Sequence, residues 1–403
     1  MESVAEPSRA PSPSVGDRAG QIAKLGDLAA EAGLRRVSML AWRDLDDPEA
    51  GGSEVHAATV AKLWGEAGIE VTMRTSFAAG HPQVNWRDGY RVIRKAGRYM
   101  IFPRGAFSEL MGWHGARDGL VEIWNGMPWF SPAWASGPRI CFLHHHHAEM
   151  WDMTLPPRMA RMGRLLESRI APPFYRRTPI VTLSESSKRE LVEEMGFKAK
   201  RITVVPPGVD PRFSPSGERS PTPLIVAAGR LVPVKRYDYL IEVLVELKRL
   251  HPAVEAVIVG EGYKREDLEA QRHEADAEDW IHLPGRIEDD ELLALYRRAW
   301  VVAGAAAREG WGMTITEAAA CGTPAVATRI AGHSDAVAAD RSGVLVEDRD
   351  QFVNALDAVL RDEGLRARLS TGALEHAGRF TWEATALGTL EVLAADAIRR
   401  RGR

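Results

Sequence analysis

The sequence predicts an α/β protein with two doubly wound, Rossmann-like domains that face each other across a cleft. Three observations predict this fold: a length of 403 residues, short apolar runs that alternate with helical patterns, and a proline-rich break in the middle. Chains of this length usually form two or three domains, and such alternation favours parallel sheets. Because parallel sheets bind ligands beyond the carboxyl ends of their strands, two facing sheets predict a binding cleft between them.

The first alternating series occupies the N-terminal half of the chain. We expect strands at residues 36–42, 70–75, 90–95, 120–124, 139–144, 179–184 and 201–206, with helices at 54–67 and 186–195. Alternating strands and helices build βαβ units, so we assign residues 21–210 to an N-terminal Rossmann-like domain. Residues 1–20 are rich in serine, proline, alanine and charge, and they predict a disordered extension.

The break lies at residues 211–223, where four prolines stand among serines and a glycine. This composition predicts a linker. After it we expect strands at 224–228, 253–259, 280–283, 301–305, 324–328 and 344–346, with helices at 237–250, 351–360, 364–376 and 382–399. We assign residues 224–380 to a second Rossmann-like domain and residues 381–403 to a helix that crosses back to the first.

Composition and charge argue against several classes of protein. The net charge of −3 gives no basic field for nucleic acid. Cys141 and Cys321 are the only cysteines, which excludes a disulfide framework and indicates buried thiols in a reducing compartment. No run approaches the ~18 apolar residues of a membrane span, and the N-terminus lacks the apolar core of a signal peptide. We therefore expect a cytoplasmic protein.

Two carboxylates eight positions apart stand out in the second domain. Glu309 follows an expected strand, and Glu317 lies about one turn inside the next helix. Gly310 and Gly312 between them allow a close approach of backbone to ligand, and the new helix N-terminus suits a phosphate. Carboxylates at this edge can accept hydrogen bonds from sugar and ribose hydroxyls. The alternative is that both are solvated or capping residues, since glutamate is common in first turns.

Two cations follow the first strand of the same domain. Arg230 and Lys235 lie in the loop GRLVPVKR, directly after residues 224–228. Such a pair at the carboxyl edge of a sheet can neutralise a diphosphate, and the guanidinium can do so through two parallel hydrogen bonds. Taken singly, the pair can equally be solvated surface charge.

The chain resembles the retaining glycosyltransferases of family 4, which have the GT-B fold. The resemblance is carried, in family order, by the segments DPEAGGSEVHA, VEIWNGMPWF, FLHHHHAEMW, TLSESSKREL, GRLVPVKRYDYLIE, VGEGYKREDLE and EGWGMTITEAAACGTPAVAT. It extends from Arg36 to the final helix. It implies transfer of a hexosyl group, with retention, from GDP-mannose or a UDP-sugar to a hydroxyl of a glycan, lipid-linked or small-molecule acceptor. We expect no metal or other cofactor, because the protein's own cations can stabilise the leaving diphosphate.

The resemblance assigns a role to each residue that matches a family motif in the second domain. Arg230 and Lys235 correspond to the basic pair on the donor diphosphate. Glu309 corresponds to the carboxylate that touches the transferred sugar, and Glu317 to the one that holds the ribose hydroxyls. These assignments place the donor mainly on the C-terminal domain.

Further assignments by resemblance complete the expected donor site. Gly51 and Gly52 match the glycine-rich loop that lets acceptor and donor phosphate approach. Arg286 and Ile287 stand where the family's backbone contacts the base, and His147 matches the histidine that faces the donor sugar. We take His147 and Glu309 as the catalytic candidates.

Stabilisation of the leaving diphosphate is expected from the start of one helix as well. Gly312, Met313 and Thr314 begin the helix that carries Glu317, and free N–H groups at a helix start favour an anion. One departure from the family lies in the loop Gly332–Asp335, which stands where many members have Gly-x-Pro-Glu. We assign Asp335 no contact.

A run of four histidines, residues 144–147, raises the question of a metal site. Adjacent side chains of an extended segment point in alternating directions, so the four rings do not converge on one ion. No nearby pair of cysteines or histidines completes a tetrahedral site. We expect no metal and take the other three histidines as packing residues.

The segment 156–170 predicts a basic amphipathic helix. Arg158, Arg161 and Arg164 recur at helical spacing beside an apolar stripe of Met159, Met162, Leu165, Leu166 and Ile170. Such a helix can lie on the anionic inner face of the cell membrane. The alternative is that the stripe packs against its own domain while the arginines are solvated or bind the acceptor.

Two other classes of function are weighed against transfer. A non-catalytic nucleotide-sugar-binding protein would keep the same clamp of cations and carboxylates. A metal-dependent hydrolase would use the histidine run. Dehydrogenases and phosphate-loop enzymes lose support because their glycine-rich motifs are missing after the first strand.

Overall fold

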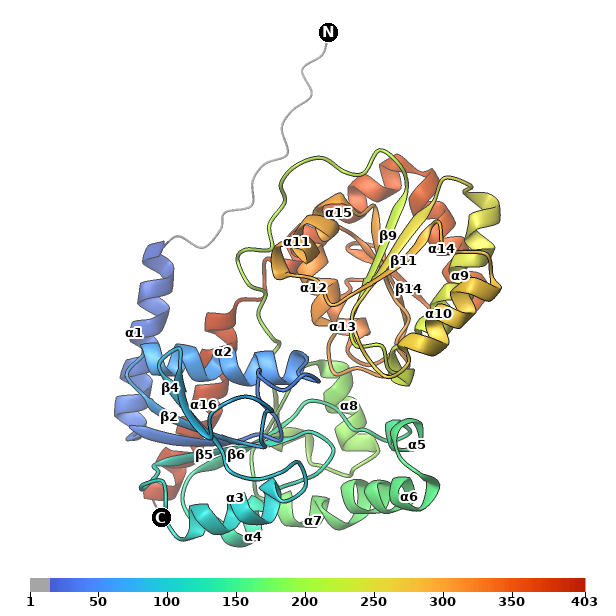
Figure 1. Ribbon diagram of the computed structural model, residues 1–403. Coiled ribbons are helices and arrows are strands. Elements are labelled where there is room, and N and C mark those ends of the chain that lie inside the picture. The colour runs from blue at the N-terminus through green and yellow to red at the C-terminus, as the bar shows by residue number, and fades with distance from the viewer. Residues whose placement is uncertain (1–14, 403) are drawn as a thin grey trace.

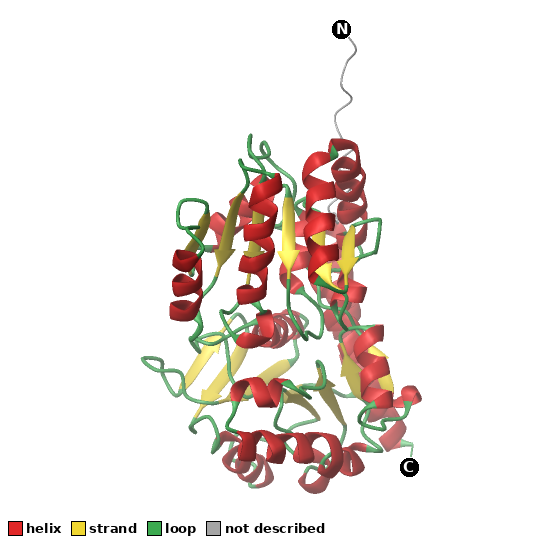
Figure 2. Cartoon of the chain, turned by 90° about the vertical axis from the view of Figure 1, so that its right-hand side faces the viewer, coloured by secondary structure: helices red, strands yellow, loops and turns green. Residues whose placement is uncertain are grey.

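The computed structural model describes residues 15–402, which form two α/β domains stacked one above the other (Figure 1). In each domain a central sheet lies between layers of helices (Figure 2). The predicted architecture of two Rossmann-like domains is therefore confirmed. Within the described residues, no helix combines the length and the hydrophobicity that a membrane span requires.

The N-terminal sheet has eight strands in the order β3-β4-β2-β1-β5-β6-β7-β8. All neighbours are parallel except β3 and β4, which form an antiparallel pair at one edge. The central strands are buried almost throughout, as expected where helices cover both faces of a sheet. The strands are β1 Arg36–Leu40, β2 Glu70–Thr75, β3 Val84–Arg87, β4 Tyr90–Arg94, β5 Gly119–Trp124, β6 Arg139–Leu143, β7 Ile180–Thr182 and β8 Ile202–Val204.

Residues 15–210 contain eight α-helices. They are α1 Val15–Ala32, α2 Gly52–Glu66, α3 Ile101–Leu110, α4 Ser131–Trp134, α5 Met150–Thr154, α6 Pro157–Leu165, α7 Pro172–Tyr175 and α8 Glu185–Glu193. A π-helical turn, Leu166–Ile170, continues α6, and a short 3₁₀ turn, Ala199–Arg201, precedes β8.

The predicted extension of residues 1–20 is wrong for its last six residues. Residues 15–20 belong to α1, and Arg18 in this helix forms ion pairs with Glu66 (2.7 Å) and Glu383 (3.0 Å). Contacts with two other helices hold this end of α1 in place despite its polar composition. The rest of the predicted extension, residues 1–14, lies outside the described residues.

The C-terminal sheet has six parallel strands in the order β11-β10-β9-β12-β13-β14. They are β9 Leu224–Ala228, β10 Glu255–Val259, β11 Ile281–Gly285, β12 Val301–Gly304, β13 Ala325–Thr328 and β14 Gly343–Val346. The helices are α9 Tyr237–Leu250, α10 Arg265–Glu274, α11 Asp289–Arg298, α12 Met313–Ala320, α13 His333–Ala336, α14 Arg349–Arg361, α15 Glu363–Ala377 and α16 Trp382–Arg401, with a 3₁₀ turn at Pro233–Lys235. Both cysteines are buried free thiols.

The chain crosses between the domains twice, and the two crossings lie side by side. The N–H of Val209 donates to the carbonyl of Phe380 (3.1 Å), and the Thr385 hydroxyl donates to the carbonyl of Pro206 (2.7 Å). A side chain on Gly208 would overlap the backbone nitrogen of Trp382, so the two segments are in direct contact there. Helix α16 then packs against α1 and α2 of the N-terminal domain.

Candidate active site

The carboxyl edges of the two sheets face each other. At this place two glycines of the N-terminal domain lie close to residues of the C-terminal domain. Gly51 and Gly52 begin α2. A Cβ atom on Gly51 would lie 3.5 Å from Nε of Arg230, and one on Gly52 would lie 3.0 Å from Sδ of Met313. Glycine at these positions therefore leaves room where the two domains come together.

Arg230 is a partly buried cation beside the N-terminal domain. Its side chain makes no hydrogen bond or ion pair with any residue that the structure describes. Burial and the neighbouring charge of Arg43 lower the pKa of Arg230, and the carboxylates of Glu54 and Glu49 act in the opposite direction. Arginine remains protonated in spite of such shifts. A free guanidinium in the cleft is suited to an anionic ligand.

Lys235 and Glu309 form an ion pair at the carboxyl ends of β9 and β12. The other oxygen of Glu309, Oε2, lies 3.7 Å from Nε2 of His333, a fully buried residue of α13. Burial would raise the pKa of Glu309, but the attraction of Lys235 and the contact with His333 outweigh it and hold the pKa well below its usual range. Glu309 is therefore ionised and held from two sides.

The start of α12 completes this edge. Gly312 precedes the helix with φ +121°, a conformation that favours glycine, and no side chain caps the helix. The N–H groups of Met313 and Thr314 in its first turn therefore remain available to an anion. One turn further, Glu317 makes no side-chain hydrogen bond or ion pair within residues 15–402.

The carboxyl group of Glu317 has an unusual pKa. Burial raises this pKa to about 7. The charge of Arg212 lowers it, while Asp289 and Asp210 raise it further. Glu317 is therefore poised to change its charge near neutral pH.

Arg286 and Ile287 lie at the same edge of the sheet but farther from the cation pair. They follow β11, which is separated from β9 by β10. The N–H of Gly260 donates to the carbonyl of Gly285 (2.9 Å), which ties the ends of β10 and β11 together. Arg286 is exposed, and Ile287 packs partly against the apolar cluster under the sheet. Within residues 15–402, no hydrogen bond or ion pair joins either side chain to the Lys235–Glu309 pair.

His147 is oriented by a residue that the sequence analysis did not single out. Its Nδ1 lies 3.1 Å from Oε1 of Glu167, and its Nε2 lies 3.1 Å from Oδ1 of Asn125. Glu167 is fully buried, and Trp151 donates to its other oxygen (2.7 Å). Burial raises the pKa of Glu167, yet the charge and hydrogen bond of His147 outweigh it and lower this pKa.

The π-helical turn explains why Glu167 escaped notice. It places Glu167 inward on a helix whose sequence shows a basic and an apolar pattern. Such turns occur frequently at functional sites. The only sign in the sequence that Glu167 has a special role is that it is the single acid in this basic and apolar segment.

The four histidines have different partners. The ring of His144 packs against those of His56 and Phe142, and His145 stacks on His147 with ring centroids 4.6 Å apart. His146 lies 2.5 Å from Glu194 and 2.8 Å from Ser168. Across residues 15–402, no three histidine, cysteine or acidic side chains are grouped to hold a metal ion.

A cation of the C-terminal domain contacts the N-terminal domain. Arg308, which follows β12, donates to the carbonyl of His146 (3.0 Å) and lies 3.3 Å from Glu190 of α8. Burial raises the pKa of Glu190 to about 7, although the charge of Arg308 lowers it.

Asp335 adds a second contact between the domains. Its carboxylate accepts hydrogen bonds from the N–H groups of Glu185 and Ser186 (3.1 Å each) at the start of α8. Sequence reasoning gave Asp335 no contact. It missed this one because the partner lies 149 residues away on the other domain.

Comparison with known proteins decides the family. Residues 210–393 match the family described as Glycosyl transferases group 1, and residues 50–213 match the family described as Glycosyltransferase Family 4. The chain is 31% identical over 417 residues to a D-inositol 3-phosphate glycosyltransferase of Xylanimonas cellulosilytica. The alignment covers 91% of this chain and 98% of that protein. The chain belongs to the group 1 glycosyltransferases of family 4. A second relative of this glycosyltransferase, from Stackebrandtia nassauensis, has the same name and is 29% identical over 92% of the chain.

Solved structures show the same fold. A sucrose-phosphate synthase from Thermosynechococcus elongatus superposes on this glycosyltransferase with a TM-score of 0.77 and 18% identity, covering 91% of this chain and 98% of that one. Anabaena HepE in complex with UDP-glucose superposes with a TM-score of 0.66 and 18% identity, covering 91% and 99%. The GT-B fold that the sequence resemblance implied is thereby confirmed.

Proposed function

We propose that this glycosyltransferase is a retaining hexosyltransferase that uses a nucleotide diphosphate sugar as donor. The observation that carries the proposal is Arg230, which has no partner among the described residues and lies close to Gly51 where the two domains meet. Lys235 and the uncapped start of α12 at Met313 lie at the same edge of the C-terminal sheet. Preorganised positive groups of this kind stabilise charge that develops on a leaving diphosphate.

The other site residues are proposed to position the sugar. Glu309, held by Lys235 and His333, is oriented to accept hydrogen bonds from sugar hydroxyls. His147, oriented by Glu167, faces the same ligand from the N-terminal domain. Attack from the face of the departing diphosphate would retain the configuration at the transferred carbon. Closure of the domains through Arg308 excludes water and so limits hydrolysis of the donor.

The acceptor is proposed to be a hydroxyl of a glycan, a lipid-linked sugar or a small molecule. Because two relatives are named D-inositol 3-phosphate glycosyltransferases, D-inositol 3-phosphate is the first acceptor to test.

The test combines donor binding with turnover. Thermal unfolding is measured with a panel of nucleotides and nucleotide sugars, since a ligand that binds the folded state raises its stability with concentration. The nucleotide sugars that stabilise the protein are then assayed for transfer, and the anomeric configuration of the product is determined. Stabilisation by no member of the panel, or an inverted product, would refute the corresponding part of the proposal.

Transfer activity is expected to survive EDTA. We propose that Arg230 and Lys235 supply the counter-charge that a divalent ion gives in metal-dependent enzymes. Rates are compared before and after chelation, with added magnesium or manganese as the control. Complete loss on chelation with recovery on metal addition would contradict this arrangement.

Donor binding is expected to tighten as the pH rises through the pKa of Glu317, about 7. Only the ionised carboxylate accepts hydrogen bonds from both ribose hydroxyls with its two oxygens free. A nucleotide diphosphate sugar has no phosphate that titrates in this range, so the change reports the protein. The dissociation constant is measured across this range for the wild type and for Glu317→Gln, which should bind more weakly and lose the dependence. An unchanged dependence in the variant would assign it to another group.

The same pKa predicts how Glu317 affects stability without donor. Its value of about 7 in the folded protein exceeds its ordinary value of 4.5. The folded state therefore binds the proton more tightly than the unfolded state. The contribution of Glu317 to stability is full below the ordinary pKa and is lost as the pH rises to about 7.

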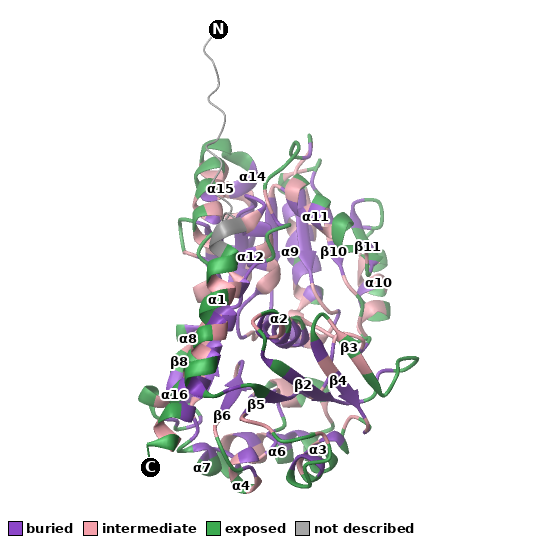
Figure 3. Ribbon diagram, turned by 90° about the vertical axis from the view of Figure 1, so that its left-hand side faces the viewer, coloured by how far each residue is buried: buried purple, intermediate pink, exposed green. Residues whose placement is uncertain are grey.

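We propose further that one face of the N-terminal domain meets an anionic membrane. Helices α3, α4, α6 and α7 lie along one side of the sheet (Figures 1 and 3). Exposed apolar side chains from these helices and the segments beside them form what we call the apolar face: Phe107, Leu110, Met111, Trp113, Met159, Met162, Leu165, Ile170 and Phe174. Exposed apolar side chains gathered on one face of a domain favour an interaction site there.

The structure bears on the alternative that the stripe of α6 packs inside its own domain. Met159, Met162 and Leu165 are 44%, 64% and 52% exposed, so these three do not pack inward. Arg158 and Arg161 next to them have no ion pair in the described part of the chain. Unpaired cations beside exposed apolar groups favour an anionic lipid surface.

Flotation with anionic vesicles is expected at low salt and is expected to weaken at high salt. Each arginine near the surface contributes ~1 kcal/mol, and salt screens it. The matched variant replaces Arg158, Arg161 and Arg164 with glutamine and should float less, while transfer to a soluble acceptor stays unchanged. Absence of flotation by the wild type at low salt would contradict the membrane proposal and leave the family assignment intact.

A further inference from the structure

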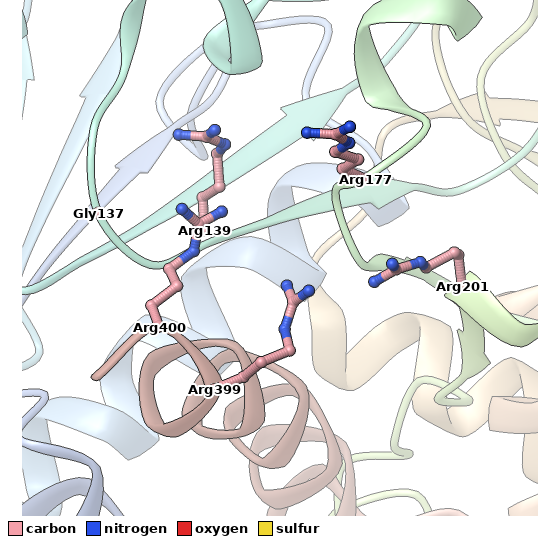
Figure 4. Close-up of a pocket in the computed structure, with 6 residues that line it drawn as sticks. All are labelled: Gly137, Arg139, Arg177, Arg201, Arg399 and Arg400. Carbon is pink, nitrogen blue, oxygen red and sulfur yellow. The ribbon is translucent and has the colours of Figure 1, made fainter. Parts of the chain in front are cut away.

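Figure 4 shows a hollow that is lined by five arginines and Gly137. Arg139 begins β6, Arg177 lies three residues before β7, and Arg201 immediately precedes β8. Because β6, β7 and β8 are neighbouring parallel strands, residues at their amino ends share one edge. The candidate active-site loops follow the carboxyl ends, at the opposite edge. The hollow is therefore separate from the cleft.

The last turn of α16 closes this hollow with two more arginines, Arg399 and Arg400. We call the five side chains the arginine pocket. Its volume is about 780 Å³. This lies within the roughly 300–1,000 Å³ typical of sites for small molecules. In Figure 4 the guanidinium groups surround a common space.

The positive charge of the arginine pocket is mostly uncompensated. Asp396 is the acid bonded to its residues, and it is shared by Arg400 (Nε to Oδ2, 2.6 Å) and Arg399. Five guanidinium groups against one carboxylate leave a formal excess of four positive charges. Arg177 and Arg201 make no side-chain hydrogen bond or ion pair with the residues that the structure describes.

Arg139 is also incompletely satisfied. Its guanidinium donates to the carbonyl of Ala135, but its Nε is buried and has no partner in the described part of the chain. Burial and the charge of Arg400 lower the pKa of Arg139, and Asp396 and Glu122 act in the opposite direction. Glu122 is turned into the core, where it accepts a hydrogen bond from the N–H of Trp129 (2.7 Å). Its carboxylate therefore does not line the arginine pocket and does not neutralise the arginines.

A smaller hollow of about 270 Å³ adjoins the arginine pocket at Arg201. It adds the cations Arg169, Arg176 and Lys198 beside the apolar side chains of Pro173 and Phe197. The positive surface thus continues from the amino edge of the sheet toward α7. An extended anion can contact both hollows at once.

We propose that the arginine pocket is a second anion-binding site, for a ligand that carries two or more phosphoryl groups. Guanidinium groups bind phosphate oxygens through paired, charge-assisted hydrogen bonds. A polyvalent anion would relieve the repulsion among the five arginines. The phosphoryl groups belong either to a free phosphorylated molecule or to the headgroups of anionic lipid. The inference does not depend on the proposed donor or acceptor.

Titration calorimetry with inorganic pyrophosphate tests the site in the full chain. All variants carry Arg230→Gln, so that binding in the cleft is weakened equally. The pocket variant adds Arg177→Gln and Arg201→Gln. The matched control adds Arg249→Gln and Arg368→Gln, two exposed arginines of the C-terminal domain that have no ion pair among the described residues. We expect the dissociation constant to rise at least tenfold in the pocket variant and to stay unchanged in the control.

Vesicle flotation distinguishes the two sources of the phosphoryl groups. Vesicles of phosphatidylcholine, with or without phosphatidylglycerol, are mixed with the same variants, all of which keep the apolar face. Loss of pyrophosphate binding alone in the pocket variant assigns a free phosphorylated ligand. Loss of binding to the phosphatidylglycerol vesicles assigns lipid headgroups. Failure of the parent protein to bind either probe, or equal binding by the parent and the pocket variant, would overturn the proposal.

Because Arg177 and Arg201 have no partners in the described structure, the pocket variant should fold. Thermal unfolding without ligand checks this, and the midpoint should be unchanged or higher because repulsion is removed. A lower midpoint would show that the two arginines stabilise the fold, which would overturn the assignment of a ligand site.

Discussion

Replacing Arg230 with glutamine is expected to lower kcat/KM by about 10²–10³-fold, the usual effect of removing one preorganised donor to a developing negative charge. The fold should not change, because the guanidinium makes no hydrogen bond or ion pair with the residues described. Glutamine keeps the length and polarity of much of the side chain but not its charge.

Steady-state kinetics with a nucleotide sugar and thermal unfolding measure the two effects separately. Arg249→Gln, at the far end of α9 from the cleft, is the matched control and should transfer like the wild type. Near-native transfer by Arg230→Gln would mean that this residue does not contact the diphosphate. The donor site would then have to be placed elsewhere.

The second large effect is expected at the ion pair of Lys235 and Glu309. Lys235→Met and Glu309→Gln should each abolish most transfer. Each should also destabilise the protein by roughly 1–3 kcal/mol, because removal of one partner leaves the other partly buried and unsatisfied. The loop position of both residues alone would suggest no effect on the fold, but the pairing in the structure predicts one.

The double variant separates the structural role of the pair from its catalytic role. Its free energy of unfolding should exceed the value expected from adding the two single effects, since neither charge is then left alone. Transfer should not recover. Additive stabilities would contradict the pairing, and recovered transfer would show that the pair only shapes the loop.

The elements predicted most accurately are the buried ones. The strand expected at 224–228 and the helix expected at 237–250 agree with β9 and α9 at every residue. In β9 all five side chains are buried, so the sequence is a continuous apolar run. In α9 the buried residues recur at helical spacing, so the period itself identifies the helix.

The elements missed have sequences that argue against them. Strand β3, Val84–Arg87, is an edge strand with no buried residue, so it shows no apolar run. Helix α3 contains Pro103 and Gly105, which usually end helices. Pro103 lies in the first turn, where its missing N–H costs no hydrogen bond, and Gly105 admits the ring of Trp129. Helix α3 therefore depends on packing against Trp129, which is distant in the sequence.

Some residues of the candidate site could be predicted from the sequence, and others could not. Arg230, Lys235, Glu309 and Glu317 follow strands of one sheet, so their common edge could be predicted from the order of elements. The positioning role of Glu167 could not, because it depends on a π-helical turn. The contacts of Arg308 and Asp335 could not either, because their partners belong to the other domain.

The two adjacent crossings between the domains limit how the cleft can open. Gly208 touches Trp382, and the N–H of Val209 donates a hydrogen bond to the carbonyl of Phe380. The two crossing segments therefore meet at one point. Sliding one domain past the other would break these contacts, whereas turning about that point preserves them. The contact between the two crossings therefore acts as a pivot. The two domains can rotate relative to each other about it, but they cannot slide past each other.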